Sequence, residues 1–220
     1  MKLEVKIFKH LHEFDLDVKF CVNEETLGLI GASGSGKSMT LKCIAGIETP
    51  DYGRIVLNGQ ILYDSELKIN LSPQKRNIGY MFQDYALFPN MNVYENIAAP
   101  LIARKLDKET VKIKVNKMID TFCLNGNEKR YPNQLSGGQK QRVALARLLV
   151  YDAKVLLLDE PFSALDEDLK IQLLSEMKEH LNKFNHPCIF VSHIKEEINY
   201  LSDKVYKIKK GKVKIETEDE

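Results

Sequence analysis

Apolar and polar positions alternate along the first part of the chain. Residues 14–20 place Phe14, Leu16, Val18 and Phe20 on one side and charged residues between them, a spacing that predicts a strand with one buried face. Further on, the apolar runs 55–57 and 60–62 flank Asn58-Gly59, a dipeptide that accepts the positive φ angles of a tight hairpin turn. The front third of the chain is therefore expected to contain an antiparallel β layer.

Three other runs are apolar without alternation, at 27–30, 155–158 and 189–191. Such runs are typical of strands covered on both faces, as in a parallel sheet flanked by helices. The terminal stretch 204–215 instead alternates apolar residues with lysines around Lys210-Gly211, and we expect a lysine-lined hairpin at a sheet edge there.

Between these strands, residues 88–150 are expected to be mainly helical. After Asp107, apolar residues recur at steps of three and four, which favours an amphipathic helix whose stripe faces a core. The stripe consists of Val111, Val115, Met118, Ile119 and Phe122.

Composition then narrows the class of protein. The chain has 220 residues, of which 44% are hydrophobic and 29% charged, as in ordinary globular proteins with a sizeable core. No stretch approaches the ~18–20 apolar residues of a bilayer span, and none resembles a signal peptide. A formal charge of +1 gives no electrostatic footprint for nucleic acid or a membrane surface.

The chain has four cysteines, Cys21, Cys43, Cys123 and Cys188. They lie far apart without metal-ligand spacing, so we expect reduced core thiols in a cytoplasmic protein.

The segment 31–38 fits the phosphate-binding pattern G-x-x-x-x-G-K-[ST], between a predicted strand and a predicted helix. It reads Gly31, Ala32, Ser33, Gly34, Ser35, Gly36, Lys37 and Ser38. Glycines let successive backbone N–H groups turn toward phosphate oxygens beside the positive end of a helix dipole. We expect Lys37 to bridge the β- and γ-phosphates and the Ser38 hydroxyl to ligate Mg²⁺, and we extend the predicted nucleotide-binding segment to Met39.

The second half of such a site follows the apolar run 155–158. Asp159, at the end of a buried strand, can reach Mg²⁺ through a water, and Glu160 can polarise the water that attacks the γ-phosphate. A strand ending in two solvated acids is the structural alternative, and the phosphate-binding loop argues against it.

At this point the residues resemble the nucleotide-binding subunits of ABC transporters. The run Leu135-Ser136-Gly137-Gly138-Gln139 is similar to the ABC signature, Gln83 to the Q-loop glutamine and His193 to the switch histidine. Ser163-Ala164-Leu165-Asp166 resembles the D-loop. These motifs stand in the family's order, and the resemblance spans nearly the whole chain.

The resemblance implies an α/β fold with a P-loop NTPase (RecA-like) core, an antiparallel β subdomain and an inserted α-helical subdomain. We expect residues 1–87 and 151–220 to form the catalytic core, and residues 88–150 to form the helical subdomain with the signature. The whole chain, 1–220, would then be a single ABC ATPase domain.

The resemblance also implies a head-to-tail homodimer around two MgATP. Ser136, Gly137, Gly138 and Gln139 of one subunit would cover the ATP held by the other subunit, since a helix begins there and its N–H groups form an anion site. Catalysis would involve Glu160, His193, Gln83 and Lys37. Ser38, Gln83 and Asp159 would hold the metal, and the cofactors are ATP and Mg²⁺.

Within the family, the segments 53–59, 71–80 and 82–89 look most like molybdate-importer ATPases, with sulfate, ferric-iron and polyamine importers sharing much of the last segment. We therefore expect import of molybdate or a similar oxyanion from the cytoplasmic face of a bacterial-type membrane. Permease subunits would dock near Gln83–Tyr94, with an external solute-binding protein acting indirectly and without nucleic acid. The alternatives are a lipoprotein-release or export-type ATPase, favoured by the segment 96–101, and a soluble ABC-type ATPase.

Many relatives stack adenine on an aromatic residue in the loop after the first strand, and here Leu11 occupies the expected place. His10, His12 or Phe8 are the alternatives nearby. Because base stacking is worth about 1–3 kcal/mol, we expect loose base selectivity, with GTP hydrolysed within about tenfold of ATP.

Overall fold

The computed structural model describes residues 1–151, 153–163 and 167–215. Its chain divides into two compact units, one of residues 1–80, 154–160 and 174–220, the other of residues 81–153 and 161–173. The predicted bounds of the helical subdomain, 88–150, thus fall inside the main segment of the second unit. Each unit is described separately.

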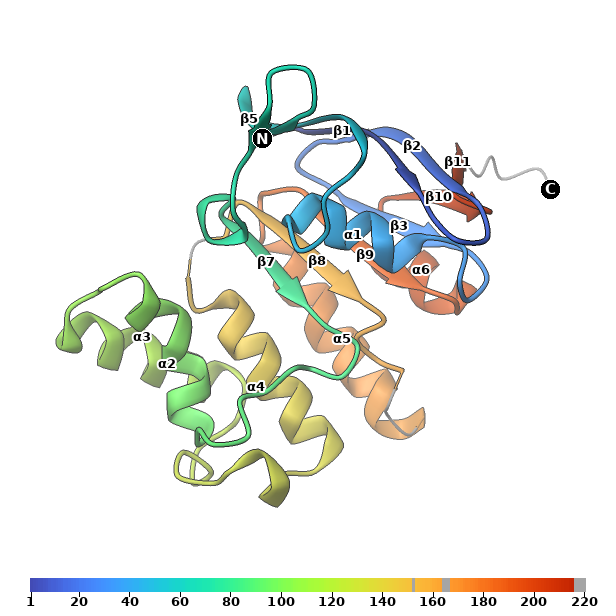
Figure 1. The fold of residues 1–220 in the computed structure, drawn as a ribbon. Helices are drawn as coiled ribbons and strands as arrows, with labels where there is room; N and C mark the ends of the chain where they lie inside the picture. The colour runs from blue at the N-terminus through green and yellow to red at the C-terminus, as the bar shows by residue number, and fades with distance from the viewer. Residues whose placement is uncertain (152, 164–166, 216–220) are drawn as a thin grey trace. The chain divides into compact units, whose positions relative to one another are not determined.

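The first unit is built on a mixed sheet (Figure 1) in the order β6-β5-β4-β1-β2-β11-β10-β3-β9-β8-β7. The strands are β1 (Leu3–His10), β2 (Asp15–Val22), β3 (Thr26–Ile30), β4 (Tyr52–Leu57), β5 (Gln60–Asp64), β6 (Ile69–Asn70), β7 (Ile78–Met81), β8 (Val155–Asp159), β9 (Cys188–Ser192), β10 (Lys204–Lys209) and β11 (Lys212–Ile215). The last residue of β7 belongs to the second unit.

The antiparallel part of the sheet confirms the sequence pattern. β1 pairs with β2 and β4, and β4 pairs with β5 across a turn whose residues Asn58 and Gly59 have φ angles of 50° and 82°. In β2, Leu16, Val18 and Phe20 are buried while the residues between them are exposed. Alternation and a turn that needs positive φ therefore suffice to place this layer.

The predicted parallel strands also form. β3 pairs in parallel with β9, and β9 in parallel with β8, and the side chains of β8 and β9 are buried throughout. Helix α1 (Lys37–Ala45) packs on β8 and β9, and α6 (Lys195–Leu201) packs on β3 and β9. Burial on both faces explains why these strands carry apolar runs without alternation.

The terminal hairpin is the element that the sequence misplaced. β10 and β11 do pair around Lys210-Gly211, but β10 also pairs in parallel with β3 and β11 touches β2 at Lys212. The hairpin therefore lies in the middle of the sheet, not at an edge. Alternation reports which side chains are buried, and it carries no information about which backbones pair on either side.

The second unit contains α2 (Val93–Ala103), α3 (Lys108–Thr121) and α4 (Gly137–Leu149), with α2 packed on both α3 and α4 (Figure 1). Helix α3 begins at the predicted place, since the Asp107 side chain accepts the backbone N–H of Thr110. Val111, Val115 and Ile119 are buried along its inner face. Helix α5 (Glu167–Asn182) contributes residues to both units, and short 3₁₀ turns occupy Pro73–Lys75 and Pro132–Gln134.

Two further findings concern the chain as described. Among the described residues, none of the helices combines the length and the apolar character that a bilayer span requires. All four cysteines are free, and Cys43 and Cys188 are buried as expected. Cys123 is exposed, and Cys21 is half-buried. The expectation of a core thiol was wrong for Cys123, because it follows the end of α3 in a left-handed turn with a φ of 50°.

Candidate functional site

The loop of residues 31–36 joins β3 to α1, as the sequence predicted. Gly36 stands at the N-cap of α1 with a φ of 105°, and a Cβ there would lie 2.8 Å from Leu16 Cδ1. Glycine is therefore required both by backbone conformation and by space. The backbone N–H groups of the first turn of α1 have no partner within the helix, which makes this end suited to a phosphate.

A buried polar atom in the loop supports that fit. The Ser35 hydroxyl oxygen is buried and has no hydrogen-bond partner among the described residues. Buried hydroxyl groups are nearly always hydrogen-bonded in folded proteins, so this oxygen is available to a ligand. Met39, the last residue of the predicted segment, is half-buried and packs against the hydrophobic core.

Lys37 rests on its own loop. Its Nζ donates to the carbonyl oxygens of Gly31 at 2.7 Å and Ala32 at 3.0 Å, and lies 3.9 Å from Glu160 Oε1. Burial lowers the pKa of Lys37, while the nearby carboxylates of Glu160 and Asp159 oppose that shift. A phosphate oxygen arriving at the loop would therefore compete with main-chain carbonyls for this ammonium group.

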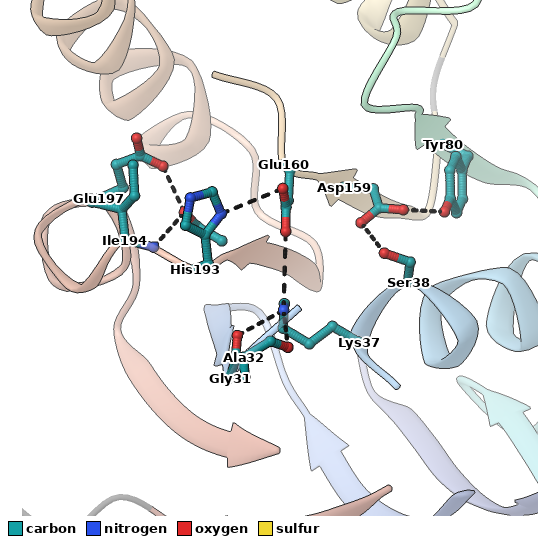
Figure 2. Close-up of polar contacts among 11 residues, drawn as sticks. Gly31, Ala32, Lys37, Ser38, Tyr80, Asp159, Glu160, His193, Ile194 and Glu197 are labelled. Atoms are coloured by element: carbon teal, nitrogen blue, oxygen red, sulfur yellow. Dashed lines mark hydrogen bonds and ion pairs between the residues drawn. The ribbon is translucent and has the colours of Figure 1, made fainter. Parts of the chain in front are cut away.

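Asp159 is held by two hydroxyl groups. Ser38 Oγ donates to Asp159 Oδ1 at 2.8 Å, and the Tyr80 hydroxyl donates to Asp159 Oδ2 at 2.8 Å (Figure 2). The pKa of Tyr80 is raised, first by burial and then by the charge of Asp159. Sequence reasoning did not single out Tyr80, which stands in a short strand without any motif signal.

The donor set of Ser38 and Asp159 fits Mg²⁺, which prefers hard oxygen ligands and takes only one or two from protein when phosphates supply others. No cluster of three or more metal-ligating side chains occurs within the described part of the chain. These two residues would hold the ion together with the nucleotide, and Gln83, the third predicted ligand, lies in the second unit.

Glu160 and His193 meet because they follow neighbouring parallel strands. Asp159 of β8 pairs with Val191 of β9, so the residues after each strand end at the same edge of the sheet. Glu160 Oε2 lies 3.4 Å from His193 Nδ1, while Oε1 faces Lys37 (Figure 2). Glu160 has a φ of 46°, a left-handed conformation that is uncommon for a residue with a side chain.

The turn that carries His193 is pinned on both sides. Ser192 Oγ donates to Glu197 Oε2 at 2.7 Å and accepts the backbone N–H of Ile194 at 3.0 Å. Glu197 is buried in α6. His193 itself is exposed, so its backbone is fixed while its ring stays open to solvent.

The signature residues form the N-terminus of α4 in the second unit. Ser136 Oγ accepts the backbone N–H of Gln139, and the Gln139 side chain accepts the backbone N–H of Ser136. This capping box starts the helix. Gly137 is exposed and Gly138 is buried.

Gln83 is also in the second unit and is exposed. The two residues that follow Asp84, Tyr85 and Ala86, have φ angles of 63° and 42°, and their carbonyl oxygens accept from Arg147 Nη2 at 2.6 Å and Nη1 at 2.8 Å. Arg147 is on α4, so one side chain ties this turn to the signature helix. No motif in the sequence assigned a role to Arg147.

The neighbouring aromatic segment is partly buried and partly exposed. Tyr85 is buried, whereas Phe88 and Met91 are exposed. Asn96, which is fully buried, donates from Nδ2 to the carbonyls of Phe88 at 3.1 Å and Met91 at 2.8 Å. The exposed apolar side chains are therefore presented on a backbone that a buried amide fixes.

The loop after β1 lies in the first unit. His10 Nδ1 is 2.6 Å from Asp15 Oδ1, Leu11 packs against the core, and Phe8 pairs with the Tyr52 ring at 6.0 Å between centroids. Phe14 lies beside the phosphate-binding loop, since a Cβ at Gly36 would meet its ring at 3.5 Å. Of the predicted D-loop, Ser163 is exposed, while Ala164, Leu165 and Asp166 lie outside the described residues.

The structure thus brings Lys37, Ser38, Asp159, Glu160 and His193 together in the first unit, beside the carboxyl ends of β8 and β9. Gln83 and the signature residues belong to the second unit.

Known proteins share the family and the fold of this chain. The family of ABC transporters matches residues 15–163. The chain is 44% identical over 206 residues to a "Probable sulfate/thiosulfate import ATP-binding protein" of Chlorella vulgaris, covering 94% of this chain and 84% of that protein. A spermidine/putrescine import ATP-binding protein of Clostridioides difficile is 42% identical over 203 residues, covering 92% of this chain and 56% of that protein.

A third relative, a sulfate/thiosulfate import ATP-binding protein of Agrobacterium fabrum, is 41% identical over 210 residues. The chain spans 58% of that protein's length and 94% of its own. These relatives give no support to molybdate as the solute.

Among solved structures, a dimeric ATP-binding cassette in a post-hydrolysis state with ADP and Pi bound matches with a TM-score of 0.82 and 25% identity, over 99% of this chain and 98% of that one. The predicted α/β fold with a P-loop core is confirmed. The chain belongs to the ATP-binding subunits of ABC transporters and is an ATP hydrolase of that family.

Proposed function

We propose that this ATPase powers import of a small solute, with a sulfate-type oxyanion as the first candidate. The observation that carries the proposal is the 44% identity over 206 residues to a protein named for sulfate/thiosulfate import. A polyamine is the second candidate, because a spermidine/putrescine import protein is similar at 42% identity. Molybdate, the solute expected from the motif surroundings, is replaced by these two.

The chemistry proposed for the site follows from its contacts. Lys37 leaves the carbonyls of Gly31 and Ala32 and binds phosphate oxygens, and the α1 N-terminus binds them through backbone N–H groups. Glu160 accepts a proton from the water that attacks the γ-phosphorus, as the bond to the ADP oxygen breaks. His193, beside Glu160, orients that water. When bound, Mg²⁺ neutralises phosphate charge.

The partners are proposed from the same family. A homodimer places Ser136–Gln139 of one subunit over the nucleotide of the other, in line with the dimeric solved cassette. Permease subunits dock on the segment Gln83–Tyr94, where Phe88 and Met91 expose apolar side chains. The complex works at the cytoplasmic face of the membrane and receives solute through an external binding protein. An export or lipoprotein-release role is the competing proposal, and a soluble ABC-type role is the weaker one.

The experiment that tests this proposal uses the complete complex, purified with its permease subunits and reconstituted in proteoliposomes. ATP hydrolysis is measured with separate binding proteins, one loaded with sulfate, one with molybdate and one with spermidine. We expect the sulfate-loaded protein to stimulate hydrolysis most. Stimulation by spermidine alone would favour the second candidate, and copurification with a permease that no binding protein stimulates would favour export.

A further inference from the structure

Both carboxylate oxygens of Asp159 accept a hydrogen bond, and the donors come from different elements. Ser38 Oγ, at the start of α1, donates to Oδ1, and the Tyr80 hydroxyl, from β7, donates to Oδ2, each at 2.8 Å (Figure 2). Asp159 is 5% exposed, so little bulk water is available to replace either donor. The carboxylate plane is therefore fixed from two sides.

This arrangement leaves the acceptors that a cation needs. An ionised carboxylate has about four lone-pair positions, and a serine hydroxyl has two lone pairs beside its single proton. The Ser38 proton points to Asp159, so its lone pairs stay available. Asp159 keeps the rest of its acceptor capacity for metal-bound water.

Tyr80 differs from Ser38 in what it can contribute. Its half-buried ring is anchored in the short strand β7, which neighbours β8 in the sheet. A phenol held in a strand cannot follow a moving ligand, but it can hold Oδ2 in one place. Residues that hydrogen-bond to a metal-binding carboxylate orient it and commonly change metal affinity 10–100-fold.

We propose that Tyr80 is a positioning residue for Mg²⁺. Before the nucleotide arrives, its hydroxyl already holds Asp159 in the orientation that binds the ion. Without that hydrogen bond, Asp159 keeps Ser38 as a partner on one oxygen only and rotates about its side-chain bonds. The Asp159 side chain would then have to be ordered when Mg²⁺ binds, and this entropic cost would lower the affinity for Mg²⁺.

The test compares Tyr80→Phe with its parent in a Glu160→Gln background, which slows hydrolysis so that binding is measured. A fluorescent ATP analogue is titrated in EDTA, and its affinity is then followed as Mg²⁺ is added. We expect unchanged affinity in EDTA and an approximately tenfold higher Mg²⁺ midpoint for Tyr80→Phe.

The chain offers a matched control in Tyr63→Phe. Tyr63 is a buried tyrosine whose hydroxyl donates to the Pro50 carbonyl at 2.7 Å, so this variant loses the same kind of bond outside the site. It should lower the melting temperature and leave the Mg²⁺ midpoint unchanged. Equal midpoints in Tyr80→Phe and Tyr63→Phe would reduce Tyr80 to a packing residue and overturn the proposal.

A double-mutant cycle keeps the test decisive if Tyr80→Phe also loses stability. Tyr80→Phe is repeated in a background that already carries Asp159→Ala, which removes both acceptor oxygens. If Tyr80 acts through Asp159, its substitution adds no further shift there. A shift of equal size in both backgrounds would show that Tyr80 acts elsewhere, and the proposal would fall.

Discussion

Arg76 is buried in the interior of the first unit, and its substitution should lower the free energy of unfolding by a large fraction. Its side chain is 1% exposed. Nη1 donates to the carbonyls of Cys43 at 2.9 Å and Ile44 at 2.8 Å, Nε donates to the Leu71 carbonyl at 2.8 Å, and Nη2 donates to Asn70 Oδ1 at 2.8 Å. Burial lowers the pKa of Arg76.

Two of these acceptors are carbonyls at the C-terminal end of α1, the helix whose other end forms the phosphate-binding loop. Backbone carbonyls in the last turn of a helix need partners outside it, and a cation there also complements the helix dipole. Gly46, which caps the helix, leaves room for the guanidinium, because a Cβ there would lie 2.5 Å from Arg76 Nε.

We expect Arg76→Met to destabilise the protein by about 3–5 kcal/mol. Hydrogen bonds that involve a charged group contribute about 1.5–3 kcal/mol each, but relief of the buried charge offsets part of their sum. The remaining cost comes from the buried carbonyls of Ile44 and Leu71, which lose the guanidinium as a donor, whereas the Cys43 carbonyl keeps the N–H of Gly46 at 3.2 Å. For a chain of this length, 1 kcal/mol corresponds to roughly 2–4 °C, so the melting temperature should fall by about 10 °C.

The assay is urea unfolding followed by far-UV circular dichroism, which gives the midpoint and slope for each variant. Arg54→Met is the matched control, since the Arg54 side chain is 55% exposed and its Nε lies 3.2 Å from Asp64 Oδ2. Asp64 is buried, but its Oδ1 keeps the backbone N–H groups of Glu66 and Leu67 as donors, so loss of the exposed Arg54 should cost about 1 kcal/mol or less. A loss below about 1 kcal/mol for Arg76→Met would refute the idea that Arg76 holds the end of α1.

The further predictions concern the site, the thiols and the nucleotide base. Glu160→Gln should bind ATP, hydrolyse it at least about a hundredfold more slowly, and accumulate as an ATP-dependent dimer on gel filtration; near-normal turnover would remove Glu160 as general base. Lys37→Ala should lose nucleotide binding in a fluorescence titration, and full ATP affinity would count against the loop as the phosphate site. A thiol reagent at pH 8 should label the exposed Cys123 first, because burial raises the pKa of Cys43 and Cys188 from an ordinary 9.0 to about 12. Above pH 9 these thiols ionise in the unfolded chain but stay protonated in the folded one. Their contribution to stability is therefore complete below pH 9 and is lost as the pH rises toward 12. A free energy of unfolding that stays constant between pH 9 and 12 would contradict the burial of these thiols. GTP should be hydrolysed within about tenfold of ATP, and strong discrimination against GTP in a steady-state assay would indicate a stacking aromatic residue that the loop after β1 did not reveal.

Local patterns determined much of this protein. Alternation placed β2, the Asn58-Gly59 dipeptide placed the β4–β5 turn, and unbroken apolar runs placed β3, β8 and β9. The phosphate-binding loop was readable for the same reason, because backbone conformation and spacing are properties of consecutive residues. Where chemistry depends on neighbours in the chain, the amino-acid order is enough.

Only the tertiary structure decided the rest. The terminal hairpin β10–β11 lies between β3 and β2 and not at an edge, Tyr80 reaches Asp159 from 79 positions away, and Arg76 caps a helix more than 30 positions earlier in the chain. In each case the group that pairs with the strand or side chain is far away in the sequence and is brought near by the fold. Hydrophobic periodicity reports burial and does not specify the partner, so long-range hydrogen bonds stay hidden until the strands are paired.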